Sequence, residues 1–162
     1  MSAGRDGAPA HETNRFITGD QAMTAVDLYS GIGYVLELLA RSESHRAFSV
    51  VRYLDVEILP PLHLGQARFY LTPDGIPTGF VSWALLDEGT ERTILQSGRA
   101  LAFHEWRCGD RLFFNDFIAP YGTAREIIAD LRSNIFPGRR ATSVRRHTDG
   151  ALRTVKYWKS SA

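Results

Sequence analysis

Histidine is the natural candidate for acid–base chemistry in this chain, because imidazole titrates near neutral pH. His45 lies in a short polar segment, residues 42–46, directly after a stretch with helical spacing. Polar turns beside packed elements often hold catalytic groups, so His45 is the candidate general base, with an exposed turn residue as the alternative. The remaining histidines fall in the N-terminal segment, in a loop or in segments with structural explanations: His11, His63, His104 and His147.

A lone carboxylate, Asp116, stands within a hydrophobic segment of the chain, residues 112–119. A strand period of two predicts one face with Leu112, Phe114, Asp116 and Ile118, and a second face with Phe113, Asn115, Phe117 and Ala119. Such a pattern is typical of a central strand that is covered on both sides. A carboxylate there is costly unless it is paired or hydrogen-bonded. Asp116 is therefore either a structural residue bonded to backbone N–H groups or a catalytic residue that orients an imidazole or an amine.

Three side chains are alternative nucleophiles. Ser42 and Ser44 flank the position of His45 and are compatible with an acyl-serine, although polar residues after a helix usually cap it. Cys108 is the single cysteine and has only Arg107 as an activating neighbour. A single cysteine also excludes an internal disulfide and a multi-cysteine metal site, and we expect no metal.

The remaining patterns predict the elements that position these groups. Their order indicates an α/β (α+β) fold, with a mixed central sheet flanked by helices. Residues 1–19 are expected to be a disordered arm and residues 20–162 a single domain. We predict a helix in 23–41 and then a segment, 48–59, that is ambiguous between helix and strand and is stopped by Pro60-Pro61. Strands 67–72 and 79–86 are joined by the turn 72–75, and a helical or irregular segment follows in 93–105. A helix starts at a Thr123/Glu126 capping box and ends at Pro137-Gly138, and a hairpin of 141–148 and 151–158 turns at Asp149-Gly150.

Three motifs, in order along the chain, resemble those of one known family. Ser42-Glu-Ser-His45-Arg46 is similar to its Ser-x-x-His-Arg motif. The segment from Pro77 to Ala84, with Ser82-Trp83-Ala84, resembles its Pro-x-x-aromatic-x-Ser-Trp-Ala, and Asp116-Phe-Ile-Ala-Pro-Tyr-Gly122 resembles its Asp-aromatic-Ile-Ala-Pro-aromatic-Gly. Over residues 24–158 the chain resembles the RTX toxin-activating lysine acyltransferases, the hemolysin-activating protein C family.

This resemblance implies a GNAT-like acyltransferase fold with His45 and Asp116 as the catalytic pair. It further implies a cytoplasmic enzyme that moves a fatty acyl group from acyl-acyl carrier protein to an internal lysine of an RTX-type toxin or exoprotein. Acyl carrier protein would be a co-substrate, without a bound cofactor, and a homodimer is compatible with the resemblance. The alternatives are a CoA-dependent N-acyltransferase for a small molecule, or a non-catalytic module that binds a carrier protein or a toxin.

The turn after the Asp116 strand is a candidate site for the donor's phosphopantetheine phosphate. Tyr121 and Gly122 lead into the helix at Thr123, where free N–H groups would attract an anion and Arg125 would add charge. A capping carboxylate would explain the same pattern. The glycine-rich loop with which acetyl-CoA enzymes of this fold hold a pyrophosphate is not found, which favours a donor on a carrier protein over CoA.

Charge is concentrated near the C-terminus of a chain whose net charge is only +1. Residues 139–159 contain seven basic side chains, Arg145 and Arg146 among them, and one acidic side chain. Acyl carrier proteins are acidic, so this segment is a candidate docking surface, with a solvated basic hairpin as the alternative. Nucleic acid is not an expected partner, and no apolar run reaches the roughly 18 residues of a membrane span.

Overall fold

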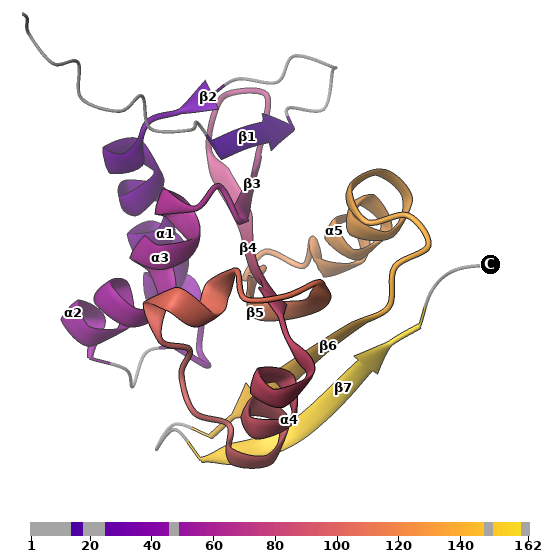
Figure 1. Cartoon of the computed structure of the whole chain (residues 1–162). Helices are drawn as coiled ribbons and strands as arrows, with labels where there is room; N and C mark the ends of the chain where they lie inside the picture. Colours follow the sequence, from indigo (N-terminus) through magenta and orange to yellow (C-terminus); the bar gives the residue numbers. More distant parts are fainter. Residues whose placement is uncertain (1–13, 18–24, 46–48, 148–150, 160–162) are drawn as a thin grey trace, which may run out of the picture.

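The computed structural model describes residues 14–17, 25–45, 49–147 and 151–159. Its core is a mixed seven-stranded sheet in the order β2-β1-β3-β4-β5-β6-β7, with parallel pairing for β1/β3 and β5/β6 and antiparallel pairing elsewhere (Figure 1). The α/β class with a mixed sheet is thus confirmed, while the GNAT-like fold stays a prediction. The strands are β1 Asn14–Ile17, β2 Ala25–Val26, β3 Ala67–Leu71, β4 Pro77–Leu86, β5 Arg111–Ile118, β6 Ala141–Arg146 and β7 Leu152–Trp158.

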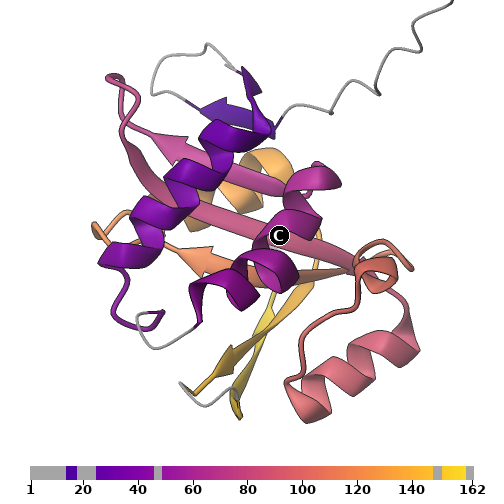
Figure 2. The same ribbon diagram turned by 90° about the vertical axis from the view of Figure 1, so that its left-hand side faces the viewer.

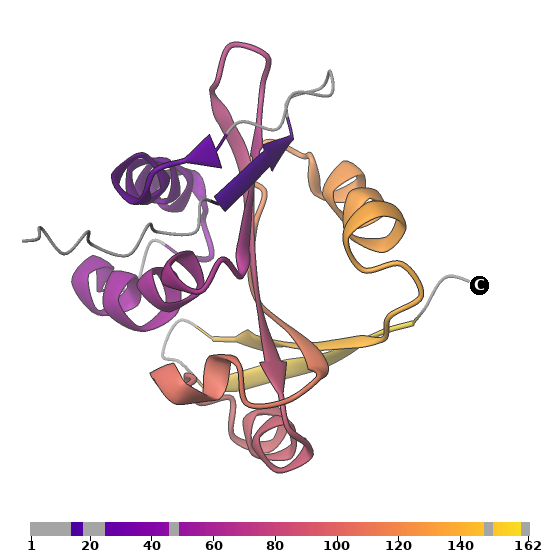
Figure 3. The same cartoon turned by 45° about the horizontal axis from the view of Figure 1, so that its top comes forward.

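Helices cover both sides of this sheet. The group α1, α2 and α3 lies on one side of the central strands and α5 on the other (Figures 1 and 3). Figure 2 shows α1 running across the sheet on its near side. The helical elements are α1 Leu28–Arg41, α2 Val50–Tyr53, the π-helix η1 Leu54–Ile58, α3 Leu59–His63, α4 Glu88–Ser97, the 3-10 helix η2 Phe103–Trp106, α5 Ala124–Asp130 and the π-helix η3 Leu131–Ile135.

Two hydrophobic clusters lie on the side of β4 and β5 that carries α1, which we call the α1 face. One gathers around Phe80 and Ile118 under α1 and α3, and the other around Ala84 and Phe113 beside α4. A third cluster fills the opposite side, the α5 face, around Phe114. Burial of this apolar surface is the main stabilising contribution to the fold.

A β-bulge at Asn115 changes the face on which Asp116 lies. Ser82 pairs with Asp116 and Trp83 pairs with Phe114, so Asn115 has no counterpart on β4. One extra residue reverses the alternation beyond it. The prediction that Asp116 shares a face with Leu112 and Phe114 is therefore wrong. The α5 face carries Leu112, Phe114, Phe117 and Ala119, and the α1 face carries Phe113, Asn115, Asp116 and Ile118.

Several other sequence predictions are confirmed. β3 and β4 are antiparallel and joined by the predicted turn, in which Gly75 has a φ of 81° and its N–H donates to the carbonyl of Thr72. β6 and β7 form the predicted antiparallel hairpin, whose turn at residues 148–150 lies outside the described residues. The predicted disordered arm, residues 1–19, is not among the confirmed predictions: Asn14–Ile17 form β1, and the rest of the arm lies outside the described residues.

Two predictions about helix ends are wrong. Pro60 and Pro61 do not stop the helical segment, because they occupy the first turn of α3, where a missing N–H costs no helical bond. Thr123 is the N-cap of α5 but its side chain forms no capping hydrogen bond. Its hydroxyl donates instead to the carbonyl of Thr78. The start of α5 is therefore hydrogen-bonded to β4 and has no capping box.

Candidate active site

His45 lies just beyond the C-terminus of α1, where the helix stops at Arg41 and Ser42 forms the C-cap. The ring nitrogen Nδ1 lies 2.6 Å from the Ser42 hydroxyl and 3.1 Å from that of Ser44. The other nitrogen, Nε2, lies 3.3 Å from Oδ1 of Asp116. Both ring nitrogens thus have polar neighbours, and the predicted pair of His45 and Asp116 is brought together from distant parts of the chain.

Asp116 sits on the α1 face, between the two hydrophobic clusters of that face. Its side chain is only 6% exposed, so it needs polar partners. Oδ2 accepts a hydrogen bond from the hydroxyl of Tyr53, and Oδ1 accepts one from the backbone N–H of Phe117. The carboxylate is therefore both bonded to backbone, as in the structural interpretation, and in contact with the imidazole, as in the catalytic one.

The environment shifts the proton equilibrium of His45. Burial by itself lowers the pKa of the imidazole, but the hydrogen bond and the negative charge of Asp116 raise it more, so the pKa lies above its usual 6.5. Burial raises the pKa of Tyr53 well above its usual range, and the charge of Asp116 adds to the effect. Tyr53 is consequently a neutral hydrogen-bond donor to Asp116 at physiological pH.

Three further polar residues surround the pair, and the sequence analysis did not assign them to the site: Tyr53, Glu57 and Asn115. The Asn115 amide donates to Glu57 at 2.8 Å, and both side chains are buried. Tyr53 and Glu57 are four residues apart in a helical region, so they lie on one side of it. In a recognised helix this spacing would have indicated that Tyr53 and Glu57 face the same side. It could not be used, because the sequence of residues 48–59 is ambiguous between a helix and a strand.

The predicted phosphate-binding residues occupy the connection between β5 and α5. Tyr121 donates its hydroxyl to Oε1 of Glu37 on α1, and Gly122 has a φ of 83°, which favours glycine. Thr123 is bonded to β4, as described above, and Arg125 is exposed. These residues follow directly on the strand that carries Asp116, so the predicted anion site lies beyond the end of that strand.

Arg145 and Arg146 do not form one surface. They are neighbours on β6 and point to opposite faces of the sheet. Arg145 is exposed, whereas Arg146 is half-buried and donates to the backbone carbonyls of Gly98 and Arg99. Arg146 also lies close enough to Glu57 for its charge to oppose the rise in that carboxyl's pKa. Arg146 therefore belongs to the α1 face. Arg145 is one of the exposed basic side chains of residues 139–159, which we call the basic surface: Arg139, Arg140, Arg145, Arg153, Lys156 and Lys159.

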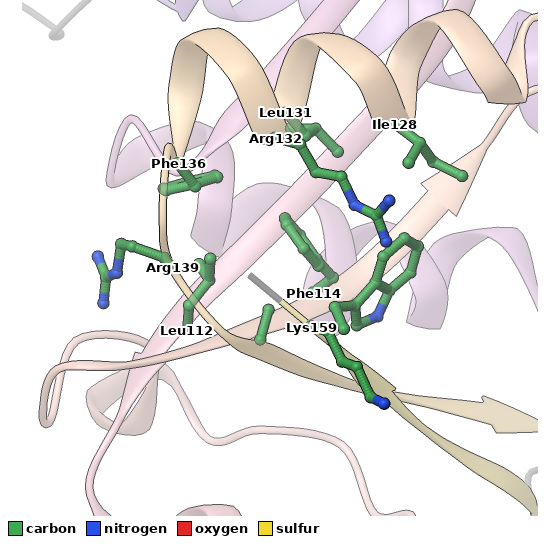
Figure 4. Close-up of a pocket in the computed structure, with 10 residues that line it drawn as sticks. Leu112, Phe114, Ile128, Leu131, Arg132, Phe136, Arg139 and Lys159 are labelled. Carbon is green, nitrogen blue, oxygen red and sulfur yellow. The ribbon is translucent and has the colours of Figure 1, made fainter. Parts of the chain in front are cut away.

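A shallow hydrophobic pocket lies on the α5 face, between η3 and the strands β5 to β7 (Figure 4). Phe114 forms part of its lining and contacts Phe136 and Trp158 edge to face. Because Phe114 and Asp116 lie on opposite sides of β5, the sheet separates this pocket from His45. The lining residues are Leu112, Phe114, Ile128, Leu131, Arg132, Phe136, Arg139, Ala141, Trp158 and Lys159.

Within the described ranges, no three His, Cys, Asp or Glu side chains are grouped so that they could hold a metal ion. No helix among the described residues is both long and apolar enough to cross a membrane.

Comparison with known proteins assigns the chain to a family. The profile of the RTX toxin acyltransferase family matches residues 24–159. Because this match spans most of the 162 residues, the chain belongs to the RTX toxin acyltransferase family and is an acyltransferase.

Individual relatives support the same assignment. The lysine-acyltransferase RtxC of Vibrio cholerae is 32% identical over 143 residues, which cover 84% of this chain and 93% of that protein. An uncharacterized protein of Synechocystis is 31% identical over 130 residues, or 78% of this chain and 88% of its own length. The leukotoxin-activating lysine-acyltransferase LtxC of Aggregatibacter actinomycetemcomitans is 40% identical over 91 residues, covering 56% and 53% of the two chains.

Proposed function

We propose that this chain transfers a fatty acyl group from acyl-acyl carrier protein to an internal lysine of an RTX-type toxin or exoprotein, in the cytoplasm. The observation that carries the proposal is the contact of 3.3 Å between Nε2 of His45 and Oδ1 of Asp116. A lysine amine has a reference pKa of about 10.4 and must lose a proton before it attacks a thioester. An imidazole is a suitable base for that step.

The proposed reaction uses the two ring nitrogens of His45 differently. Because Nε2 faces the Asp116 carboxylate, it carries the N–H of the neutral imidazole, and the lone pair is on Nδ1, beside the Ser42 hydroxyl. His45 takes one proton from the lysine ammonium, the lysine nitrogen bonds to the thioester carbon, and the bond from that carbon to sulfur breaks. The imidazolium gives this proton to the departing thiolate, and the second proton that the nitrogen loses on becoming an amide leaves to solvent. Asp116 stabilises the imidazolium that forms in between, and the Tyr53 hydroxyl holds Asp116 in place.

The donor is proposed to arrive as a phosphopantetheine thioester on the carrier protein, without a bound cofactor. Its phosphate would lie at the β5–α5 connection, with Tyr121, Gly122 and Thr123 supplying backbone and Arg125 supplying charge. This location is compatible with the chemistry because the connection follows the strand of Asp116.

The acidic carrier is proposed to dock on the basic surface that includes Arg145. Arg145 supports this role because it is exposed. Arg146 was predicted to share the role, but its guanidinium already bonds to two backbone carbonyls. We therefore assign carrier docking to Arg145. Arg146 instead holds β6 against the residues that follow α4.

The acceptor proposal draws on the relatives. Those named above include proteins described as lysine-acyltransferases and as leukotoxin-activating, and another relative, ApxIC of Actinobacillus pleuropneumoniae, is described as RTX-I toxin-activating. An internal lysine of a protein of that class is the acceptor that suits the proposed base.

Acyl transfer with purified components tests this function. The chain is mixed with palmitoyl- or myristoyl-acyl carrier protein and an RTX-type acceptor protein, and acyl-lysine is measured by mass spectrometry. We expect acyl-lysine with the wild type and a loss of at least about 100-fold in rate for His45→Ala, the lower range for general-base catalysis. Circular dichroism should show the same fold for both, because His45 lies in a turn outside the hydrophobic clusters.

Four outcomes would each contradict part of the proposal. Retained activity in a folded His45→Ala variant would remove the base role. Acylation that requires acyl-CoA would support the CoA-dependent alternative, and carrier binding without transfer would support a non-catalytic module. A chain that gains one acyl group without an acceptor, and loses this property in Ser42→Ala, would make Ser42 a nucleophile.

A further inference from the structure

Two buried oxygen atoms on the α1 face have no hydrogen-bond partner among the described residues. They are Oγ of Ser82, which is 0% exposed, and Oδ1 of Asn115, which is 7% exposed. Buried polar atoms are normally bonded, and each exception calls for a specific explanation. Neither atom is used by the proposed proton transfer, so both keep unsatisfied hydrogen-bonding capacity beside the site.

A second buried carboxylate lies beside them. Glu57 is only 8% exposed, and the hydrogen bond assigned to it comes from the Asn115 amide. Burial raises the pKa of Glu57, and the negative charge of Asp116 acts in the same direction, while the charge of Arg146 and the Asn115 hydrogen bond oppose it. Two carboxyl groups therefore lie near each other, and only one of them has a role in the proposed reaction.

The β-bulge explains why these groups lie together. It turns Asn115 and Asp116, which are consecutive, toward the same face. Ser82 is the direct cross-strand partner of Asp116 and lies on that face as well. We call the group of Glu57, Ser82, Asn115 and Asp116 the polar well. It borders the ring of His45 through the Asp116 contact.

The polar well has more acceptors than donors. Its unused atoms are a hydroxyl and an amide oxygen, and its charges are those of two carboxyl groups. The nearby cation, Arg146, donates to the carbonyls of Gly98 and Arg99 instead. A primary ammonium carries three N–H donors and one positive charge, which match this arrangement.

We propose that the polar well binds the ammonium group of the acceptor lysine, with Glu57 as a specificity-determining residue. This inference rests on the proposed function for the identity of its ligand. It gives Glu57 a role distinct from that of Asp116: Glu57 selects a cationic side chain, whereas Asp116 stabilises the protonated imidazole. The lysine nitrogen would then lie next to the contact between His45 and Asp116.

n-Pentylamine, an analogue of the lysine side chain, tests the site without an acceptor protein. At neutral pH it is a cation, and 1-pentanol is its neutral counterpart of similar size. We expect pentylammonium to shift the side-chain amide signal of Asn115 in a saturable NMR titration at constant ionic strength, and pentanol to leave it unchanged. Glu57→Gln should weaken pentylammonium binding by about 10-fold, since the negative charge that faces the ammonium is lost while an acceptor oxygen remains.

The matched control is Glu91→Gln, which changes a shielded glutamate bonded to Thr142 and Arg111 outside the well. It should leave pentylammonium binding unchanged. Equal shifts by pentanol, no saturable shift in the wild type, or equal binding by Glu57→Gln would overturn the proposal. If pentylammonium binds as expected but the wild type transfers no acyl group, the ammonium site stands and the proposed function fails.

Discussion

The two faces of β5 differ in how their hydrophobic packing is interrupted. On the α5 face, Leu112, Phe114 and Phe117 belong to one continuous cluster. On the α1 face, Phe113 and Ile118 belong to separate clusters, and the polar residues Asn115 and Asp116 lie between them. A single strand thus presents a packing surface on one side and a polar site on the other.

The polar interruption of the α1 face thus depends on the backbone conformation as well as on the residue types. The bulge brings two consecutive polar side chains to the α1 face and leaves the aromatic series of the α5 face unbroken. The hydrophobic clusters on either side of the site keep Asp116 poorly hydrated, which strengthens its interaction with His45. Substitutions on the two faces should therefore affect different properties of the protein.

The largest expected effect is a loss of stability from the α5 face. Phe114→Ala removes a buried ring that contacts Phe136 and Trp158, and such truncations cost about 3 to 5 kcal/mol of unfolding free energy. Urea unfolding should show this loss, while kcat per folded molecule stays close to that of the wild type. If Phe114→Ala unfolds the chain, Phe114→Leu gives the same comparison with a smaller loss. A large fall in kcat of a folded variant would show that the two faces are not independent.

A smaller effect, on the barrier rather than on stability, is expected for Asp116→Asn. Its shape is preserved but the imidazolium loses its counter-charge, so acyl transfer should slow by about 100-fold, or roughly 2.7 kcal/mol. The base must be neutral to act, so activity rises with pH through the pKa of His45. In the wild type the midpoint should lie above the ordinary imidazole value of 6.5, because that pKa is raised.

In Asp116→Asn the midpoint should move to lower pH. The charge that raises the pKa of His45 is gone, and the burial that lowers it remains. The pH–rate profiles of both proteins, measured with saturating donor, check this shift. An unchanged midpoint in a folded Asp116→Asn variant would show that the charge of Asp116 does not act on His45, and would leave Asp116 with a structural role.

The smallest expected effect comes from the exposed basic surface. Arg145→Glu should raise the KM for acyl-acyl carrier protein several-fold and leave kcat nearly unchanged, because exposed charges act mainly on encounter. The difference from the wild type should shrink with salt, since screening reaches about 10 Å at 0.1 M. Acyl-pantetheine, which lacks the carrier, should show no difference. Equal damage with both donors would place Arg145 in the fold or the active site.

Arg146 provides the contrast within the same strand. Because its guanidinium bonds to the carbonyls of Gly98 and Arg99, its replacement should disturb the packing of β6 against α4 rather than the encounter with the carrier. Adjacent arginines with equal charge thus differ in role because the strand turns them to opposite faces.

The sequence by itself determined which elements form in much of the chain, and it singled out His45 and Asp116, which the structure brings into contact. Turn residues at 72–75 and the alternating patterns of β3, β4, β6 and β7 are local signals, so they could be recognised without tertiary structure. The motifs around His45 and Asp116 likewise indicated the acyltransferase family, to which the chain belongs.

Only the tertiary structure decided which face Asp116 occupies and which groups surround it. The bulge at Asn115 depends on the pairing of β4 with β5, and that pairing cannot be read from the alternation of β5 alone. Tyr53 and Glu57 reach the site because a helical region, ambiguous in sequence, packs over the α1 face. Long-range pairing and burial assemble the polar well, because its members come from segments with no local signal that connects them.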